Sequence, residues 1–302
     1  MMNNKTLLAA LLWVACGTAH GFDLGSELEK AVKEKVQQPA APAQKQNTAP
    51  AAKENDIGLG SLFSGLGGFS QEEEITIGRQ IAGNLLGAVP LVKDKKLQKY
   101  VNDVGRWVAS QSERPDLPWH FGVIESNDVN AFAAPGGYIF VTKGLYKQLL
   151  NEAELAGVLG HEIGHVVRQH HLNILQQSKL LDVGGKLLAK ETGGSDAAQK
   201  LIGSGAEIVS RSLDKGAEFE ADRMGVVLAT RAGYDSFGLP SVLQQIGHFA
   251  KDDGSVALLF KTHPHPDDRL DKLGRAMGDR FDDIKGLTLE KRFYRIKSPR
   301  QN

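Results

Sequence analysis

Residues 161–165 have the sequence HEIGH and lie inside a segment from Asn151 to His171 whose apolar pattern predicts an α-helix. His161 and His165 are four residues apart, so a helix places both imidazoles on one face, one turn apart. That separation allows both rings to reach one Zn²⁺ ion at about 2.0–2.1 Å. Glu162 points away from this pair but can accept a proton from a water molecule activated by the metal. The pattern predicts a hydrolytic zinc centre.

A catalytic zinc ion needs a third protein ligand, and the EFEAD sequence at 218–222 offers two candidates. On a helix, Glu218 and Asp222 share a face, whereas Glu220 is turned about 200° from Glu218. One of the pair can bind zinc while the other orients a ligand histidine through its second ring nitrogen. The spacing leaves this choice open. The alternative is a surface charge cluster that pairs with Lys215 and Arg223.

His170 and His171 follow the HEIGH sequence by nine and ten residues from His161. A continuous helix cannot bring either ring to the same metal ion. We expect His170 to orient a neighbouring group or to lie in the core.

The segment 130–141, NAFAAPGGYIFV, places a Pro-Gly-Gly turn before a strand. Such a turn can set up an exposed edge strand, which pairs with an extended peptide through backbone hydrogen bonds. An ordinary hairpin is the alternative. The candidate substrate-binding residues are Asn130, Ala131, Phe132, Ala133, Pro135, Gly136 and Gly137.

The segment 261–269, KTHPHPDDR, holds two histidines made rigid by two prolines in a predicted loop. A histidine or arginine of this loop can stabilise the oxyanion that develops during hydrolysis. A solvated loop with no catalytic role is the alternative.

The N-terminus has the pattern of an export signal. Lys5 precedes an apolar run from Thr6 to Ala15, and small residues allow cleavage after Gly21. Cleavage before Cys16 would instead give a lipid-anchored protein, although Trp13 does not fit the usual lipoprotein pattern. No other stretch is long and apolar enough to span a membrane.

The rest of the chain divides by composition. Residues 22–70 are rich in Ala, Pro and Gly and are expected to form a flexible tether. A folded domain is expected over 71–284 and a basic C-terminal tail over 285–302. Within the domain, 119–125 and 138–142 are predicted strands. The stretch 180–203 is a lid or a long connection.

Charge and cysteine content narrow the function classes. The 302 residues contain 36 basic and 36 acidic residues, so the chain lacks the positive charge typical of a nucleic-acid-binding protein. With one cysteine, no intrachain disulfide or cysteine-based metal site can form. A metal ion must therefore be held by His, Asp or Glu.

Four motifs, HEIGH, EFEAD, NAFAAPGGYIFV and HPHPDDR, occur in the order typical of one family. The chain resembles the gluzincin metallopeptidases of the HtpX and CAAX-prenyl-protease type, in the soluble periplasmic BepA/LoiP-like branch. The resemblance covers about Gln71 to Arg275 and lacks the helical-repeat domain of BepA. It implies an α+β fold, a mostly helical zincin-type domain with a small β-sheet beside the HExxH helix.

The resemblance also implies roles for single residues. Glu162 is the implied catalytic base, and Asp222 supports a ligand without touching the zinc ion. His263 and Arg269 are implied to stabilise the transition state, and His263 to be able to fill the open zinc position and hold the enzyme latent. His265 begins a second His-Pro pair, so which of the two histidines faces the metal stays open. The implied ligands of a single zinc ion are His161, His165 and Glu218.

We therefore expect a periplasmic zinc endopeptidase that hydrolyses unfolded or misassembled envelope proteins, with the outer-membrane assembly machinery as a further partner. Two alternatives remain. One is a metal-binding holdase that grips extended chains without cutting them. The other is a secreted degradative protease.

Overall fold

The structure is a computed structural model that describes residues 68–177, 213–250 and 253–297. The predictions for the export signal, for Cys16, for most of the tether and for 180–203 lie outside these residues. No helix in the described part is long and apolar enough to cross a membrane.

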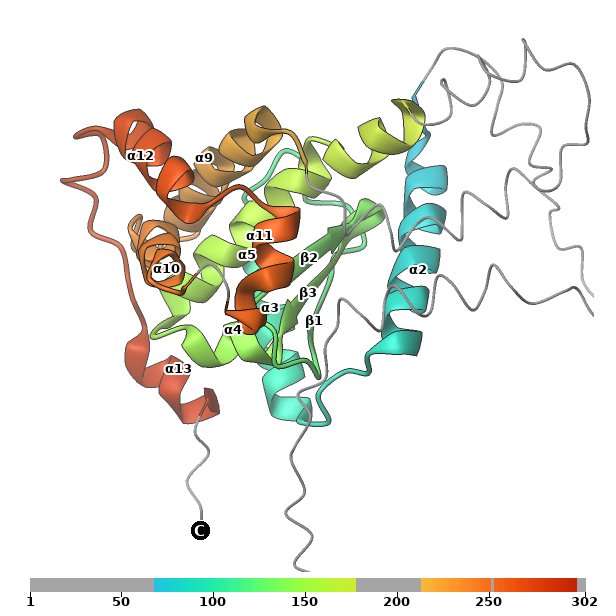
Figure 1. Ribbon diagram of the computed structural model, residues 1–302, viewed down its shortest axis with the longest axis horizontal. Coiled ribbons are helices and arrows are strands. Elements are labelled where there is room, and N and C mark those ends of the chain that lie inside the picture. The colour runs from blue at the N-terminus through green and yellow to red at the C-terminus, as the bar shows by residue number, and fades with distance from the viewer. Residues whose placement is uncertain (1–67, 178–212, 251–252, 298–302) are drawn as a thin grey trace, which may run out of the picture.

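The described chain is mostly helical with one small sheet, which confirms the predicted α+β class (Figure 1). Residues 170–177 are also helical. The elements are α2 (Gln71–Ala88), α3 (Lys95–Ala109), β1 (His120–Ile124), β2 (Ala131–Ala134), the 3-10 turn η2 (Pro135–Gly137), β3 (Tyr138–Thr142), α4 (Lys143–Gln148), α5 (Glu152–Val167), α9 (Lys215–Arg231), α10 (Gly238–Gly247), the 3-10 turn η3 (Gly254–Val256), α11 (Ala257–Thr262), α12 (Pro266–Met277) and α13 (Glu290–Lys297).

The sheet has the strand order β1-β3-β2. Strand β3 runs parallel to β1, with Phe121 opposite Ile139, and antiparallel to β2, with Phe132 opposite Phe140. The strand predicted at 138–142 is therefore the central strand of the sheet. The edge strand that follows Asn130 in the sequence is β2. This differs from the expectation that the Pro-Gly-Gly turn leads into the edge strand.

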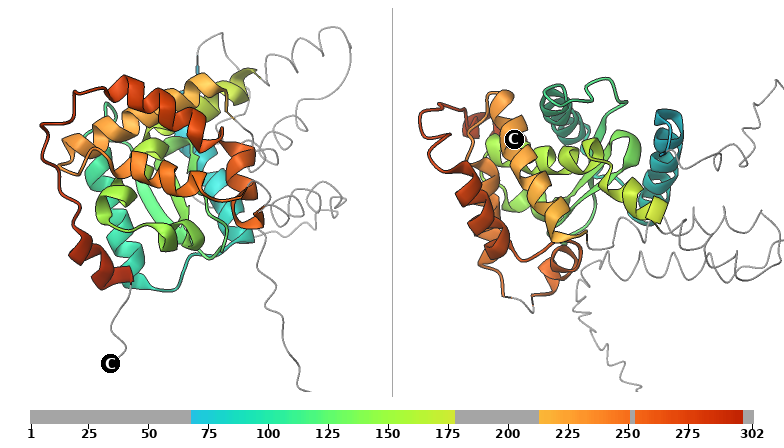
Figure 2. Two further views of the ribbon diagram at one scale, coloured as in Figure 1. Left: turned by 60° about the vertical axis from the view of Figure 1, so that its left-hand side comes forward. Right: turned by 90° about the horizontal axis from the view of Figure 1, so that it is seen from above.

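The two faces of the sheet bury different partners because side chains alternate along a strand. Ala131, Ala133 and Ile139 join the main core with α3 and α5, whereas Phe132 and Phe140 pack against α2 and Leu258. Helices α9, α10 and α12 lie on the other side of α5 from α2 (Figures 1 and 2). Helix α5 is thus enclosed on several sides, and every one of its residues is buried.

Helix α5 begins where Asn151 caps it, since the Asn151 side chain accepts a hydrogen bond from the Glu154 N–H at 3.0 Å. It ends earlier than the sequence predicts. Arg168 and Gln169 form a turn, Gln169 has a φ of 56°, and a new helical segment begins at His170. The prediction of one continuous helix to His171 is therefore wrong, because the left-handed conformation of Gln169 interrupts the helix.

Helices α5 and α9 approach each other closely at glycines. A Cβ atom on Gly160 would lie 2.9 Å from the Gly225 carbonyl oxygen, and one on Gly225 would lie 2.9 Å from the His161 nitrogen. Only glycine allows this separation without displacing a backbone. The crossing places the HEIGH turn of α5 directly beside the first turns of α9.

Helix α13 packs on the domain, so the predicted basic tail over 285–302 needs correction for this segment. Phe293 is fully buried against Tyr146, and Arg292 forms an ion pair with the buried carboxylate of Glu152. Glu152 also accepts hydrogen bonds from Tyr100 and Tyr234, at 2.6 and 2.7 Å. The C-terminal helix is thereby tied to the first residue of α5.

Replacing Phe293 by alanine is expected to lower the free energy of unfolding by about 3 kcal/mol, near the lower end of the usual cost for a buried phenylalanine because a terminal helix can readjust. Urea unfolding followed by circular dichroism measures the change. Tyr294→Ala is the matched control, since Tyr294 is 38% exposed in the same helix. Equal losses for the two variants would show that α13 does not pack as described.

Candidate metal centre

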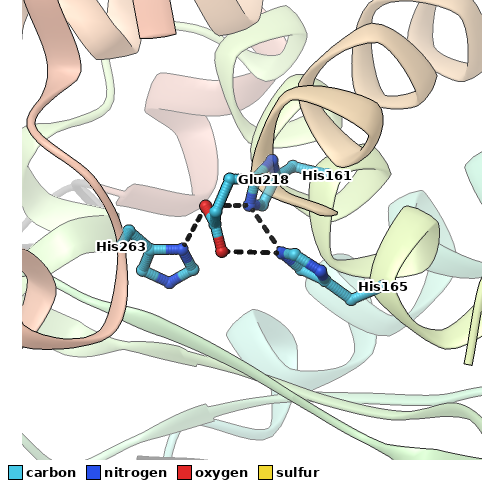
Figure 3. A group of neighbouring side chains, drawn as sticks. All are labelled: His161, His165, Glu218 and His263. Carbon is cyan, nitrogen blue, oxygen red and sulfur yellow. Dashed lines mark hydrogen bonds and ion pairs between the residues drawn. The ribbon is translucent and has the colours of Figure 1, made fainter. Parts of the chain in front are cut away.

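Four buried side chains from three separate segments meet at one point (Figure 3). His161 and His165 come from α5, Glu218 from the first turn of α9, and His263 from the residue that ends α11. One potential ligand atom of each lies within 4.8 Å of the others. The structure thus brings together the three predicted ligands and one of the two loop histidines.

The spacing of these atoms fits a small cation. The Nε2 atoms of His161 and His165 are 3.0 Å apart, and the Glu218 oxygens lie 3.7 and 3.5 Å from them. Ligands of a tetrahedral zinc ion sit about 3.4 Å from each other, given bond lengths of about 2.0–2.1 Å. Within the described residues, Glu218 Oε1 is buried with no hydrogen-bond partner. A bound cation would satisfy this oxygen.

The protonation states of His165 and Glu218 also suit a cation, which needs neutral imidazole and ionised carboxylate ligands. Burial and the neighbouring His161 hold the pKa of His165 well below its usual value. Burial acts to raise the pKa of Glu218, but the charge of His263 and its hydrogen bond outweigh this and hold that pKa well below the usual range.

Asp222 lies on the opposite side of the His161 ring from Glu218. Its Oδ1 is 2.9 Å from His161 Nδ1, so the ring presents Nε2 to the group of four and Nδ1 to Asp222. Arg269 binds Asp222 with two hydrogen bonds, at 2.9 and 2.6 Å, and its Nη2 lies 3.3 Å from His161 Nδ1. Glu218 therefore faces the Nε2 atoms of both imidazoles, whereas Asp222 lies at the other nitrogen of the His161 ring.

Glu162 is buried beside this group, and burial raises the pKa of its carboxyl group despite the opposing charges of His161 and His263. It lines an apolar cavity of about 40 Å³ together with Ala131 and Val158. A raised pKa helps a carboxylate to take up a proton near neutral pH.

The two loop histidines have different places. His263 donates from Nδ1 to the carboxylate of Glu218 at 2.8 Å, whereas His265 caps α12 and is outside the group. The segment that links α11 to α12 needs a residue to end one helix and another to begin the next. No spacing rule predicts which of the two histidines takes which place.

The predicted substrate-binding residues lie in two environments. Asn130 is fully buried, its side-chain oxygen accepts from the Ala131 N–H at 3.0 Å, and its Nδ2 has no partner among the described residues. The Pro-Gly-Gly turn instead lies under α2, where Glu74 accepts a hydrogen bond from the Gly136 N–H at 3.0 Å. A Cβ atom on Gly78 would be 1.7 Å from the Pro135 oxygen, so this turn packs tightly against α2.

One contact was not predicted from the sequence, and for another, that of His170, the neighbouring group was left open. The buried carboxylate of Glu74 joins Arg114, at 2.7 Å, to the turn before β3. His170 reaches the metal-facing His165, with the two Nδ1 atoms 2.9 Å apart. An acidic residue on the apolar face of α2 was a usable signal for the first contact. The second depends on the turn at Gln169, which has no signature in the sequence.

A helix that carries two imidazoles and a neighbouring glutamate, facing a carboxylate from a second helix, defines a site of the metallopeptidase class. The comparison of the sequence with known families agrees with this class. The chain belongs to Peptidase family M48, whose profile matches residues 95–276.

Three curated relatives illustrate the similarity. The chain is 29% identical over 211 residues to a β-barrel assembly-enhancing protease of Yersinia pestis, covering 67% of this chain and 43% of that protein. It is 30% identical over 208 residues to the protein of that name from Escherichia coli K12, covering 66% and 42%. It is 25% identical over 275 residues to metalloprotease YcaL of Escherichia coli K12, covering 89% and 95%. The chain therefore spans well under half the length of the first two relatives.

Proposed function

We propose that this protein is a zinc-dependent endopeptidase that hydrolyses internal peptide bonds of unfolded or misassembled cell-envelope proteins. The observation that carries the proposal is the buried group of His161, His165 and Glu218 with Glu162 beside it. Membership of Peptidase family M48 supports the peptidase class. The similarity to β-barrel assembly-enhancing proteases supports the envelope setting.

In this proposal the metal ion is held by His161, His165 and Glu218. When bound, zinc polarises the scissile carbonyl group and lowers the pKa of water to about 7. Glu162 accepts the proton of the attacking water and passes it to the leaving amine. Asp222 fixes the ring of His161, because its carboxylate holds the second nitrogen.

The substrate is proposed to bind as an extended chain along β2, the edge strand of the sheet. This proposal is supported by Ala131, which borders the cavity that Glu162 lines. Asn130 directly precedes this strand, and its buried Nδ2 has no hydrogen-bond partner within the described residues. Phe132 and Ala133 belong to the same strand, whereas Pro135, Gly136 and Gly137 shape the turn that follows it.

The location and partners extend the same proposal. An export signal over 1–21 would deliver the protein to the periplasm, with lipid anchoring through Cys16 as the alternative. A tether over 22–70 would then precede a metallopeptidase domain that begins near Gln71. The outer-membrane assembly machinery is a proposed partner because the named function of two relatives concerns β-barrel assembly.

The proposal is tested by measuring whether the purified protein cleaves casein. Activity is expected to disappear when a chelator removes the metal and to return with an equivalent of Zn²⁺. Zinc content is measured in each sample. Cleavage that survives complete removal of the metal would contradict a metal-dependent mechanism. Zinc binding without cleavage of any unfolded protein, by the wild type and by the His263→Ala variant alike, would favour the holdase, for which Glu162 has no use.

His263 provides a separate prediction. In the described arrangement its ring lies with the three proposed ligands, where it is able to complete a fourfold set. Replacing His263 by alanine is therefore expected to raise casein cleavage, because it opens a position for substrate. Initial rates at equal zinc content measure the effect. Lower activity would instead assign the ring to the transition state, and unchanged activity would exclude both roles.

A further inference from the structure

The two helix-borne histidines of the centre are supported in different ways. His161 has a carboxylate, Asp222, on its outward nitrogen, whereas His165 meets another imidazole. We propose that His170 and Glu220 are positioning residues that fix the ring of His165 for metal binding. This inference rests on the proposed metal centre and adds to it a set of supporting groups outside the predicted site.

The break in the helix after Val167 makes the contact between His165 and His170 possible. On a continuous helix, residues five apart point in different directions, about 140° from each other. The left-handed turn at Gln169 redirects the chain, so that the His170 ring lies 5.1 Å from the His165 ring at an angle of 68°. Both rings are buried. The conformation of Gln169 thus delivers a side chain to the back of a ligand.

Hydrogen-bond donors and acceptors alternate along the series of groups from His165 through His170 to Glu220. His165 directs Nε2 to Glu218 and His161, so in the metal-bound form its proton is on Nδ1. That N–H can donate to Nδ1 of His170, 2.9 Å away. His170 then carries its own proton on Nε2, which faces Glu220 Oε2 at 3.5 Å. The proton on Nδ1 of His165 therefore requires that Nδ1 of His170 accept it, which leaves the proton of His170 on Nε2.

The outer end of the chain of groups is held by an arginine. Arg168 binds the other oxygen of Glu220, with Nε 2.8 Å from Oε1, and also pairs with Glu113 at 3.1 Å. Arg168 and Glu220 line a surface cavity of about 240 Å³ and are each 39% exposed. Because solvent screens this end, Glu220 is expected to matter less than the buried ring of His170.

The test measures release of zinc to a chromogenic chelator, with no substrate present. Replacing His170 by leucine is expected to speed zinc release about 10- to 100-fold, because losing a group that supports a ligand usually weakens metal affinity by that factor. Glu220→Gln is expected to have a smaller effect. The double variant should release zinc at the rate of His170→Leu alone, because both act through one contact.

His170→Gln serves as the conservative replacement. Its amide oxygen can accept from His165 and its amide nitrogen can donate to Glu220, so zinc release is expected to stay close to the wild-type rate. His171→Leu is the matched control, since His171 is also buried and its ring lies 5.8 Å from His165, but no hydrogen bond joins the two in the described structure. Thermal unfolding of the metal-free variants separates a loss of fold from a loss of ligand support.

Wild-type rates of zinc release from His170→Leu would overturn the proposal, as would equal acceleration by His171→Leu. The proposal would also be overturned if, across the variants, the increase in the rate of zinc release simply tracked the decrease in the unfolding temperature of the metal-free protein. The readout is independent of catalysis, so a chain that binds zinc without cleaving casein would contradict the proposed function and still decide this inference. A wild-type chain that holds no zinc would contradict both.

Discussion

Replacing Glu162 by glutamine is expected to lower kcat/KM for peptide hydrolysis about 10³-fold while zinc stays bound, within the usual range for a lost general base. The amide keeps the size of the side chain but cannot accept the proton of the attacking water. Glu162 lies beside the metal-binding group without being part of it, so the ligands are spared. Casein cleavage and zinc content of the same preparations give both quantities.

Glu154→Gln is a suitable control because it makes the same chemical change in the same helix. Glu154 is buried two turns before Glu162 and bonds to Leu150, Asn151 and Gln245 rather than to the metal centre. Its activity is expected to match the wild type. If Glu162→Gln cleaved casein as fast as wild type, the assignment of the base and the mechanism built on it would have to be abandoned.

Replacing Arg269 by leucine is expected to lower the free energy of unfolding of the metal-free protein by about 3–5 kcal/mol, the usual cost of breaking a buried ion pair. Arg269 is 5% exposed, Asp222 is 1% exposed, and they share two hydrogen bonds, so the change leaves an uncompensated carboxylate in the interior. Urea unfolding of the metal-free protein measures the loss.

A second variant separates this role from one in the transition state. Adding Asp222→Asn to Arg269→Leu removes the stranded charge, and we expect it to recover part of the lost stability. The separate variant Arg269→Lys is expected to be less stable than the wild type, because an ammonium group cannot form the bidentate contact of a guanidinium group with Asp222. Wild-type stability of Arg269→Leu together with a large fall in kcat would assign Arg269 to the transition state instead.

The sequence predicts those parts of the protein that depend on local pattern. The strands at 119–125 and 138–142 and the helix that carries HEIGH all follow from periodicity and residue type. The spacing within HEIGH and EFEAD narrows the metal centre to a few side chains. These features depend on residues close together in the sequence, so one sequence is enough to recognise them.

The remaining features depend on contacts between distant segments. The sequence of helix α13 predicts a basic tail. Phe293 is nevertheless buried, because α3, α4 and α5 provide a site for its ring. His170 supports His165 only because the chain turns at Gln169, a residue with no special tendency to do so. The separation of His263 from His265 follows from where α11 ends and α12 begins. Tertiary packing sets each of these.

The glycine crossing of α5 and α9 has a consequence for how the metal centre is encoded. Gly160 and Gly225 carry no chemical group, yet their lack of a side chain sets the distance between the imidazoles of one helix and the carboxylate of the other. The ligand spacing is therefore a property of the backbone, present before any ion arrives. Such preorganisation lowers the rearrangement needed on binding. A survey of mutations that disable the centre should therefore find sensitive positions among residues that never touch the metal.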